Sequence, residues 1–546
     1  MATLEGMVEA RVKVTSCSDH PDVRVMHQEA TSAPLAPYHL ADMDVVVLIG
    51  LLRWRLDMKR SEIKAFLHSR GLDLSEGTIS NRSLDFLLLF ARLHRDRHER
   101  MRTALAGRGG TVLHMDGTHK SGGRVTFVLQ EDHNGIIIDA ALVPSEGEEH
   151  VGKVLASYKE MYGRPLVVVR DMSDSLAAAV TNVFPGVPQQ ICQVHFLRNI
   201  ERTLLSGPHA TLKRLIVRHH LTPRLRSLRV TDAKGERGIG DLERLWAHVA
   251  VDYLLHPVKQ QTKWLSAPLP YFFQHQRVAE VSKLVQRLVR WNASRYLVCN
   301  AVMDLDLCLR EVLEDHDVRN AFNIVRRTIR WLDMARVPLR ISRATHLKDT
   351  PPDGRSIEEV KAMLRAVLDR IVREGREIGG EHHRVASAIR RAFDEHWDEL
   401  FVPFPMVKGK PVRFRRHNNA LESSHRWTRK GIRERTGKER TRLEMEQFGD
   451  LLAILSNLWN PAYQRLVLDD VRDLSQALGQ YIPDLPRLRA EYRLARSGPE
   501  RPIPDGERLE VLEGFLQALE SSVDDEDLIS RLMDIVGMEA NDLATC

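Results

Sequence analysis

The sequence predicts an α/β core built on a mixed five-stranded sheet, interrupted by a large all-α insertion and flanked by helical segments. Three observations lead to this prediction. The periodicity of apolar residues changes from helical to strand-like after Gly109 and Gly110. Two further apolar runs then alternate with helical segments, as in sheets that contain parallel strands. From about Thr203 to Glu395 apolar residues recur at spacings of three and four, which is typical of helices.

Size and charge bound the possible functions. At 546 residues and 62.4 kDa, the chain is long enough for about three or four domains. Its 43% hydrophobic and 28% charged residues are ordinary for a soluble globular protein. The net charge is +6, but residues 501–546 hold 12 acidic and 3 basic side chains, so the first 500 residues carry +15. We therefore expect a polyanionic partner for that part.

Cysteine usage and hydropathy indicate a reducing, aqueous environment. The longest apolar run near the start, Val45 to Leu52, is far shorter than the roughly 20 residues that span a bilayer. We expect no membrane partner and a cytoplasmic location. The five cysteines form no CxxC pair and are too scattered for a disulfide framework: Cys17, Cys192, Cys299, Cys308 and Cys546.

The sequence pattern of the N-terminal region predicts a loose arm over residues 1–40, followed by a helix-turn-helix. Two short helices are separated by Gly71, and Ser75 can cap the second one. Such a pair often reads DNA with the start of its second helix, although the same geometry can serve packing alone. The residues that would contact DNA are Thr78, Ser80, Asn81 and Arg82.

The strands of the core are predicted in an informative order. Three of them are joined by short glycine-bearing turns, as in an antiparallel meander, and two follow with a helix before each. This is the order of an RNase H-like sheet, although other α+β domains share parts of it. The predicted segments are Thr111–Asp116, Arg124–Gln130, Gly135–Val143, Leu166–Arg170 and about Gln189–Val194.

Three carboxylates are candidates for phosphoryl-transfer chemistry. Asp116 ends the first predicted strand and Asp171 follows the fourth, and these strands are neighbours in an RNase H-like sheet. Paired carboxylates of this kind can hold two Mg²⁺ ions, roughly 3.5 to 4 Å apart, that act on an attacking and a leaving oxygen. Asp174 competes with Asp171 for this role, and we favour Asp171 because it directly follows a buried strand. Glu422 is the third candidate.

Glu422 lies in the most basic part of the sequence. Residues 407–442 hold 13 Lys or Arg and 3 Glu, a net charge of +10, interrupted by Phe414 and Trp427. Such a run around a candidate metal ligand suits a nucleic-acid backbone. Alternatively, Asn419 and Glu422 form a capping box at the start of a helix. The candidate DNA-binding residues are Arg415, Arg416, Arg426, Arg429, Lys430 and Arg433.

Four motifs in this order resemble bacterial insertion-sequence transposases of the DDE class. They begin at Leu113 (LHMDGT), Val167 (VVVRDMS), Cys192 (CQVHFLRN) and Asn418 (NNALE followed by basic residues). The closest groups share a CxxH motif with Mutator-like transposases. The two spacings are 55 residues from Asp116 to Asp171 and 251 from Asp171 to Glu422. The second gap agrees with the helical insertion that we infer from periodicity.

The resemblance implies an RNase H-like core, dependence on Mg²⁺ or Mn²⁺, and DNA cleavage and strand transfer at transposon ends. It also implies that the pair Cys192 and His195 lies beside the site, whereas the plain alternative is a buried cysteine and a hydrogen-bonded histidine. A zinc site is disfavoured, because the similar pair Cys17 and His20 lies in the loose arm and zinc usually needs four ligands. Relatives with an N-terminal zinc element differ from this chain, which has no CxxC there.

We therefore expect a transposase that binds terminal inverted repeats as a dimer or higher oligomer, in the cytoplasm of a bacterium at the nucleoid. A non-catalytic DNA-binding regulator and an RNase H-like structure-specific nuclease are the alternatives. The expected domains are a loose arm at 1–40, the helix-turn-helix at 41–105, the first part of the core at 106–205, the insertion at 206–405, the last part of the core at 406–460, and a helical, acidic segment at 461–546.

Overall fold

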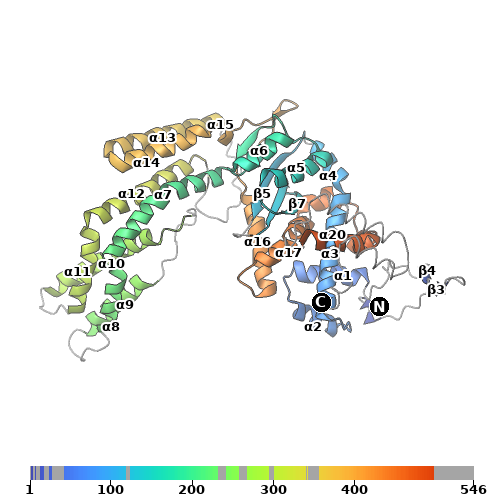
Figure 1. Cartoon of the computed structure of the whole chain (residues 1–546), viewed down its shortest axis with the longest axis horizontal. Coiled ribbons are helices and arrows are strands. Elements are labelled where there is room, and N and C mark those ends of the chain that lie inside the picture. Colours follow the sequence, from blue (N-terminus) through green and yellow to red (C-terminus); the bar gives the residue numbers. More distant parts are fainter. Residues whose placement is uncertain are drawn as a thin grey trace, which may run out of the picture. The chain divides into compact units, whose positions relative to one another are not determined.

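Figure 1 shows the computed structural model of the chain, which divides into two compact units, Met1–Leu485 and Pro486–Cys546. Cys17, His20 and the acidic segment 501–546 lie outside the described residues. No helix in the described part of the chain is long and apolar enough to cross a membrane. The structure describes residues 2–3, 6–7, 13–16, 24–27, 42–107, 109–118, 123–231, 241–256, 267–293, 300–339, 341 and 356–496.

A mixed five-stranded sheet forms the α/β core, in the order β7-β6-β5-β8-β9. The first three strands pair antiparallel, β8 lies parallel to β5, and β9 lies parallel to β8. The predicted sheet, with its first and fourth strands adjacent, is therefore confirmed. The strands are β5 (Val112–Thr118), β6 (Val125–Glu131), β7 (Ile137–Val143), β8 (Val167–Arg170) and β9 (Gln189–Ile191).

Two strand ends differ from the prediction. β5 continues two residues beyond Asp116, so this carboxylate lies within the strand rather than at its end. β9 stops at Ile191, short of the predicted Val194. A helix begins at Gln193 instead. The apolar side chains of Val194 and Phe196 belong to this helix and are buried. Short apolar runs do not distinguish a strand from a buried helix.

Both faces of the sheet are covered, which explains the continuous apolar run in β8. Val168 packs on one face with residues of α5 (Glu148–Tyr162) and α6 (Asp174–Val183), including Tyr158 and Leu176. Val167 and Val169 point to the other face, where they contact Phe414 and Val402. α17 (Arg442–Leu455) packs against β6 and β7. Figure 1 shows the sheet with α5 and α6 beside it.

The described residues of the N-terminal segment form two pairs of short antiparallel strands and four helices. Within the predicted arm, β1 (Ala2–Thr3) pairs with β2 (Gly6–Met7) and β3 (Lys13–Ser16) with β4 (Arg24–His27). Ile49, Ile63 and Ile79 from the first three helices share one apolar cluster. The predicted cap at Ser75 is confirmed, because its Oγ accepts from Thr78 N at 3.0 Å. The helices are α1 (Met43–Trp54), α2 (Arg60–Ser69), α3 (Glu76–Asp96) and α4 (His98–Ala106).

α3 is long enough to contact both the N-terminal helices and the sheet. Near its middle, Phe86 crosses α1 so closely that a Cβ on Gly50 would lie 2.2 Å from the Phe86 ring. Near its end, the imidazole of His94 is hydrogen-bonded to the Ile138 carbonyl of β7 at 2.9 Å and to the Tyr463 hydroxyl at 3.0 Å. The second predicted helix is thus a structural support of the core over its C-terminal half.

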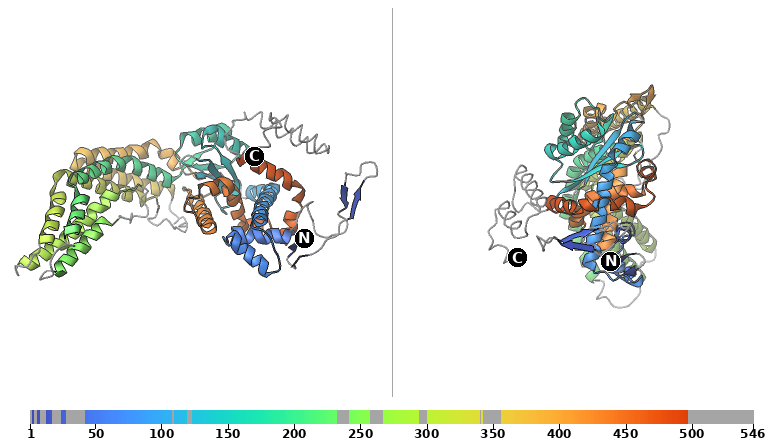
Figure 2. Two further views of the ribbon diagram at one scale, coloured as in Figure 1. Left: turned by 60° about the horizontal axis from the view of Figure 1, so that its bottom comes forward. Right: turned by 90° about the vertical axis from the view of Figure 1, so that its right-hand side faces the viewer.

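The insertion is helical throughout the described residues between β9 and the return to the core, and it has its own large apolar core. α7 is continuous from Gln193, so the expected domain border at residue 206 falls inside one helix. Figure 2 shows these helices in colours from green to orange. They are α7 (Gln193–Arg218), α8 (Leu221–Thr231), α9 (Asp241–Leu255), α10 (Pro270–Ala293), α11 (Asn300–Glu314), α12 (His316–Arg336), α13 (Ile357–Ile378), α14 (Gly380–Glu395) and α15 (Trp397–Leu400).

The chain returns to the core through a small hairpin, β10 (Met406–Val407) with β11 (Lys410–Pro411), and then enters α16 (Asn419–Thr436). Short helices follow α17. They are the 3₁₀ helix Ser456–Trp459, α18 (Pro461–Leu466), α19 (Leu474–Gly479) and the 3₁₀ helix Ile482–Asp484. α20 (Leu485–Arg496) begins at the last residue of the first unit, and its other residues belong to the second unit.

Candidate active site

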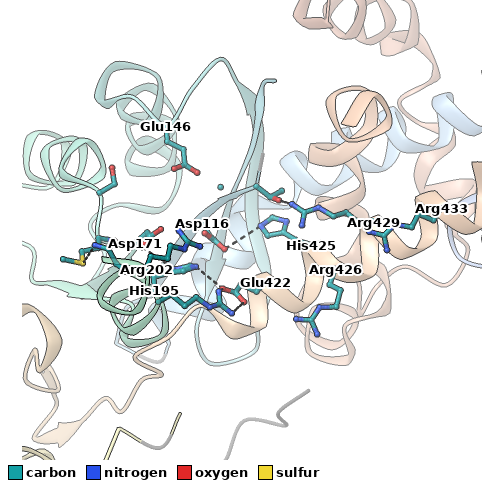
Figure 3. A pocket seen from close by; sticks show the side chains of 16 residues that line it. Asp116, Glu146, Asp171, His195, Arg202, Glu422, His425, Arg426, Arg429 and Arg433 are labelled. Atoms are coloured by element: carbon teal, nitrogen blue, oxygen red, sulfur yellow. Dashed lines mark hydrogen bonds and ion pairs between the residues drawn. The ribbon is translucent and has the colours of Figure 1, made fainter. Parts of the chain in front are cut away.

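A polar cavity of about 690 Å³ brings the three candidate carboxylates together. Its wall comes from the end of β5, the loop before α5, the loop between β8 and α6, and one face each of α7 and α16 (Figure 3). Four carboxylates line it, Asp116, Glu146, Asp171 and Glu422, together with five arginines, Arg198, Arg202, Arg426, Arg429 and Arg433. Negative carboxylates and positive guanidinium groups therefore line the same cavity, which is open to solvent.

Asp116 is the most buried of the three, with 7% of its surface exposed. Burial, and the negative charges of Glu422, Asp171 and Glu146, raise its pKa to about 7 although His195 opposes the shift. His425 Nε2 lies 4.0 Å from Asp116 Oδ2 and has no hydrogen bond within the described protein. A nearby cation would relieve this crowding of negative charge.

Asp171 follows β8 directly and is partly exposed to the cavity. Its Oδ1 accepts from the Met172 amide at 2.6 Å and lies 3.6 Å from His195 Nδ1. Asp174 instead begins α6, is exposed, and is absent from the cavity wall in the described structure. Of the two alternatives, Asp171 is thus the one that faces Asp116 and Glu422.

Glu422 projects from the first turn of α16 and is held by two cationic groups. Its Oε2 accepts from Arg198 Nη2 at 3.0 Å, and its Oε1 accepts from Arg198 Nη1. His195 Nε2 lies 3.0 Å from the same Oε1. Burial disfavours the charged carboxylate, but His195 and Arg198 outweigh it and lower the pKa of Glu422 to about 2. Both carboxylate oxygens are therefore engaged by protein groups.

Asn418 fixes the start of α16 against the sheet. Its side-chain Nδ2 donates to the Met115 carbonyl at 2.9 Å, and its backbone N–H donates to Cys192 Sγ at 3.3 Å. The helix is preceded by Asn418 as the N-cap residue, with no side-chain cap bond. The capping-box alternative for Asn419 and Glu422 is therefore wrong.

The CxxH pair divides into a buried and a cavity-facing residue. Cys192 is buried beneath the site, where it accepts from Asn418. His195 lies on the cavity wall between Asp171 and Glu422, as the site-adjacent interpretation expects. Burial disfavours its charge, but Cys192, Glu422 and Asp116 outweigh this and raise the pKa of His195 to about 12.

The basic residues around Glu422 separate into three groups. Arg426, Arg429 and Arg433 share the face of α16 that carries Glu422 and line the cavity. Lys430 is not part of the cavity wall, and its Nζ lies 3.4 Å from Glu434 and 5.1 Å from the ring centre of the exposed Trp427.

Arg415 and Arg416 form the third group and are used inside the protein. Arg415 Nε donates to Asp132 at 2.9 Å. Arg416 stacks on Phe404 and Phe414, donates to the Val402 carbonyl at 2.7 Å, and has its pKa lowered to about 10 by burial. Neither arginine is part of the cavity wall.

The four helix-turn-helix residues lie in the first two turns of α3. Asn81 is exposed, and Thr78 and Ser80 are partly exposed. Arg82 differs, because its Nη1 lies 3.0 Å from Asp85, whose carboxylate is buried. The sequence pattern could not distinguish this internal ion pair from a DNA contact.

Sequence reasoning missed four ionisable residues of the cavity, Glu146, Arg198, Arg202 and His425. A signal for three of them was present in the spacing. Arg198 and Arg202 follow His195 at three and seven positions along a helix, and His425 follows Glu422 at three. Glu146 lies in a loop, and no periodicity points to it.

The donor chemistry of the cavity suits a divalent cation at Asp116 and Asp171, whose hard carboxylate oxygens come from β5 and from the residue directly after its parallel neighbour β8. The complete three-carboxylate site is not assembled, since Glu422 is bound to Arg198 and His195. Among the described residues, no three His, Cys, Asp or Glu side chains are grouped closely enough to hold a metal ion.

Clustered carboxylates beside arginines are typical of sites that act on phosphate groups. Residues 112–199 match the family model of the MULE transposase domain. The matched segment runs from β5 to the second turn of α7 and includes Asp116, Asp171 and His195. No curated protein matches the chain. The domain match supports a transposase and, with it, DNA as the partner.

Proposed function

We propose that the chain is the DNA transposase of an insertion sequence, which binds terminal inverted repeats and catalyses metal-dependent strand cleavage and strand transfer. One observation carries the proposal. Within a segment that matches a transposase domain, Asp116 and Asp171 share one cavity with Glu422, which comes from 251 residues beyond Asp171. Arginines extend from Glu422 along the same helix face.

The strand order supports an RNase H-like core within this proposal. Three antiparallel strands are followed by two parallel ones, with the first and fourth adjacent. This order places Asp116 and Asp171 at the same edge of the sheet. The long helical insertion between Asp171 and Glu422 leaves the core at α7 and returns before β10.

In the proposed reaction, Asp116, Asp171 and Glu422 hold Mg²⁺ or Mn²⁺. Bound there, such cations supply activation of the attacking oxygen and neutralise charge on the leaving oxygen. Arg426, Arg429 and Arg433 bind phosphates of the DNA strand and align it beside the carboxylates. His195 orients Asp171 and Glu422 through its two ring nitrogens, which face one carboxylate each.

The N-terminal helices and the helical insertion serve DNA recognition and assembly. The exposed start of α3 reads the terminal inverted repeats through Thr78, Ser80 and Asn81. Two transposon ends must be processed together, so a dimer or higher oligomer is expected, with the insertion contributing to strand binding. The protein then acts at the bacterial nucleoid.

Cleavage assays with Mg²⁺ and DNA that carries the flanking repeats test the proposal. Nicking at the repeat ends should be lost in Asp116→Ala, Asp171→Ala and Glu422→Ala. Asp174→Ala is the matched control, because Asp174 is an exposed carboxylate three residues from Asp171. That variant should keep wild-type activity.

The two alternatives give different outcomes in the same assay. Binding to the repeats without nicking favours a regulator, and cleavage that is indifferent to the repeats favours a structure-specific nuclease. Inverted repeats on both sides of the gene would add independent support for a transposase.

A further inference from the structure

The ion pair between Arg198 and Glu422 occupies the third candidate carboxylate. Two parallel N–H···O bonds join the guanidinium and the carboxylate, which is the strongest pairing geometry available to these groups. The exposed fractions of the two side chains are 26% and 20%, so solvent screens the pair only partly. A cation cannot use Glu422 fully while this pair is intact.

Arg198 is placed to serve a second partner. It lines the same cavity as Asp116 and Asp171, on the second turn of α7. The base of this helix is fixed to the core, since Gln193 N donates to the Arg416 carbonyl at 2.9 Å and Gln193 Nε2 to the Leu400 carbonyl at 3.1 Å. The backbone of Arg198 therefore stays at the cavity wall whichever group its guanidinium binds.

We propose that Arg198 is a phosphate-binding residue that exchanges partners: it pairs with Glu422 in the free protein and with a DNA phosphate when Glu422 turns to a divalent cation. This inference rests on the proposed function and adds a residue to it. Planar guanidinium groups bind carboxylate and phosphate with the same two-pronged geometry, so the exchange preserves both hydrogen bonds of Arg198.

The exchange couples the two ligands. Removing Glu422 from Arg198 leaves a partly buried charge without its partner, which is costly unless a phosphate replaces the carboxylate. DNA should therefore increase the affinity for the cation, and the cation should increase the affinity for DNA by the same factor. In the absence of DNA, Arg198 weakens cation binding.

Mn²⁺ binding to the full-length protein without DNA, measured by electron paramagnetic resonance, tests the exchange. We expect Arg198→Ala to bind Mn²⁺ about tenfold more tightly than wild type, because one bidentate ion pair no longer competes. We expect the same variant to bind DNA more weakly and to lose most of the enhancement of Mn²⁺ affinity by DNA.

Arg202→Ala is the matched control, because Arg202 lies one turn further along α7 on the same cavity wall. It removes the same charge and should leave DNA-free Mn²⁺ affinity near wild type. Arg198→Lys, which keeps the charge without the two-pronged geometry, should fall between wild type and Arg198→Ala. If circular dichroism shows that Arg198→Ala does not fold, Arg198→Lys replaces it in the Mn²⁺ titration.

Three results overturn the exchange. If Asp116→Ala abolishes Mn²⁺ binding while Arg198→Ala binds like wild type, the metal site stands and the exchange is wrong. If no variant, nor wild type, binds Mn²⁺, the metal-dependent proposal and the exchange both fail. Equal tightening in Arg198→Ala and Arg202→Ala would show a general charge effect and would also exclude it.

Discussion

The side-chain Oδ1 of Asn418 is hydrogen-bonded to His114 Nδ1 at 2.9 Å, although 304 residues separate them. The Asn418 amide nitrogen donates to the Met115 carbonyl, so Oδ1 is the atom that accepts from the histidine. His114 Nε2 is hydrogen-bonded at 2.9 Å to Asp132, whose pKa is lowered to about 2 by His114 and Arg415 despite burial. This network connects β5, which carries Asp116, with the start of the helix that carries Glu422.

Asn418→Ala should therefore affect both stability and activity. It leaves the buried His114 Nδ1 and Met115 carbonyl without a partner, and each such loss costs about 1–3 kcal/mol. We expect the free energy of unfolding in urea to fall by about 2–4 kcal/mol and DNA cleavage to fall because Glu422 is less well positioned. Asn419→Ala, at the adjacent and partly exposed position, should cost under about 1 kcal/mol. Equal losses in the two variants would contradict this role.

Gly50 and Gly77 should respond to alanine with opposite signs. A Cβ at Gly50 would meet the Phe86 ring at 2.2 Å, so Gly50→Ala should force α1 and α3 apart and lower the stability by about 1–3 kcal/mol. At Gly77 the nearest atom is 3.7 Å away, and alanine should stabilise α3 by up to about 1 kcal/mol. Thermal unfolding of both variants checks the contrast. A stabilised Gly50→Ala would show that the helices do not cross this closely.

His94 should contribute to acid sensitivity. Burial lowers its pKa to about 4, with a smaller contribution from Arg95, although the bond to Ile138 opposes the shift. The unfolded chain takes up a proton here near pH 6.5, whereas the folded protein does so only near pH 4. The unfolded state therefore binds more protons in this window, and stability is lost as the pH falls from about 6.5 to 4, by roughly 2–3 kcal/mol in total.

His94→Gln should flatten this part of the pH dependence of unfolding. The exposed His316 provides the control, and His316→Gln should keep the wild-type slope between pH 4 and 6.5. Urea unfolding at half-unit pH steps gives the comparison. An unchanged slope in His94→Gln would exclude this histidine as a source of the acid sensitivity.

The cavity-facing arginines of α16 should dominate the salt dependence of DNA binding. Each phosphate contact that is lost should reduce the slope of log K against log salt concentration by about 0.9. We expect Arg426→Ala with Arg433→Ala to reduce it by roughly 2, and Lys430→Ala, on the same helix but outside the cavity wall, to change it by less than half a unit. Binding titrations at several salt concentrations measure the slopes. A larger effect of Lys430 would place the DNA outside the cavity.

Local patterns in the sequence predicted the main elements correctly. The change of period after Gly110 predicts the sheet, the buried run of β8 predicts a central strand, and the spacing of three and four predicts the helical insertion. The predicted ends of the strands were less accurate. Val194 is buried in a helix, but an apolar side chain at this position would suit a strand equally well. These features depend on residues that are close in sequence.

The sequence by itself determined the main elements, their order and three of the four carboxylates that line the cavity, because apolar period and residue type are local properties. Only the tertiary structure decided which charges pair with which. Arg415 and Arg416 belong to a basic run, yet the side chains of Asp132 and Gln190 come from distant segments and bind them inside the protein. Arg198 likewise meets Glu422 across 224 residues. The strength of an ion pair depends on distance and burial, which are set by how the chain folds.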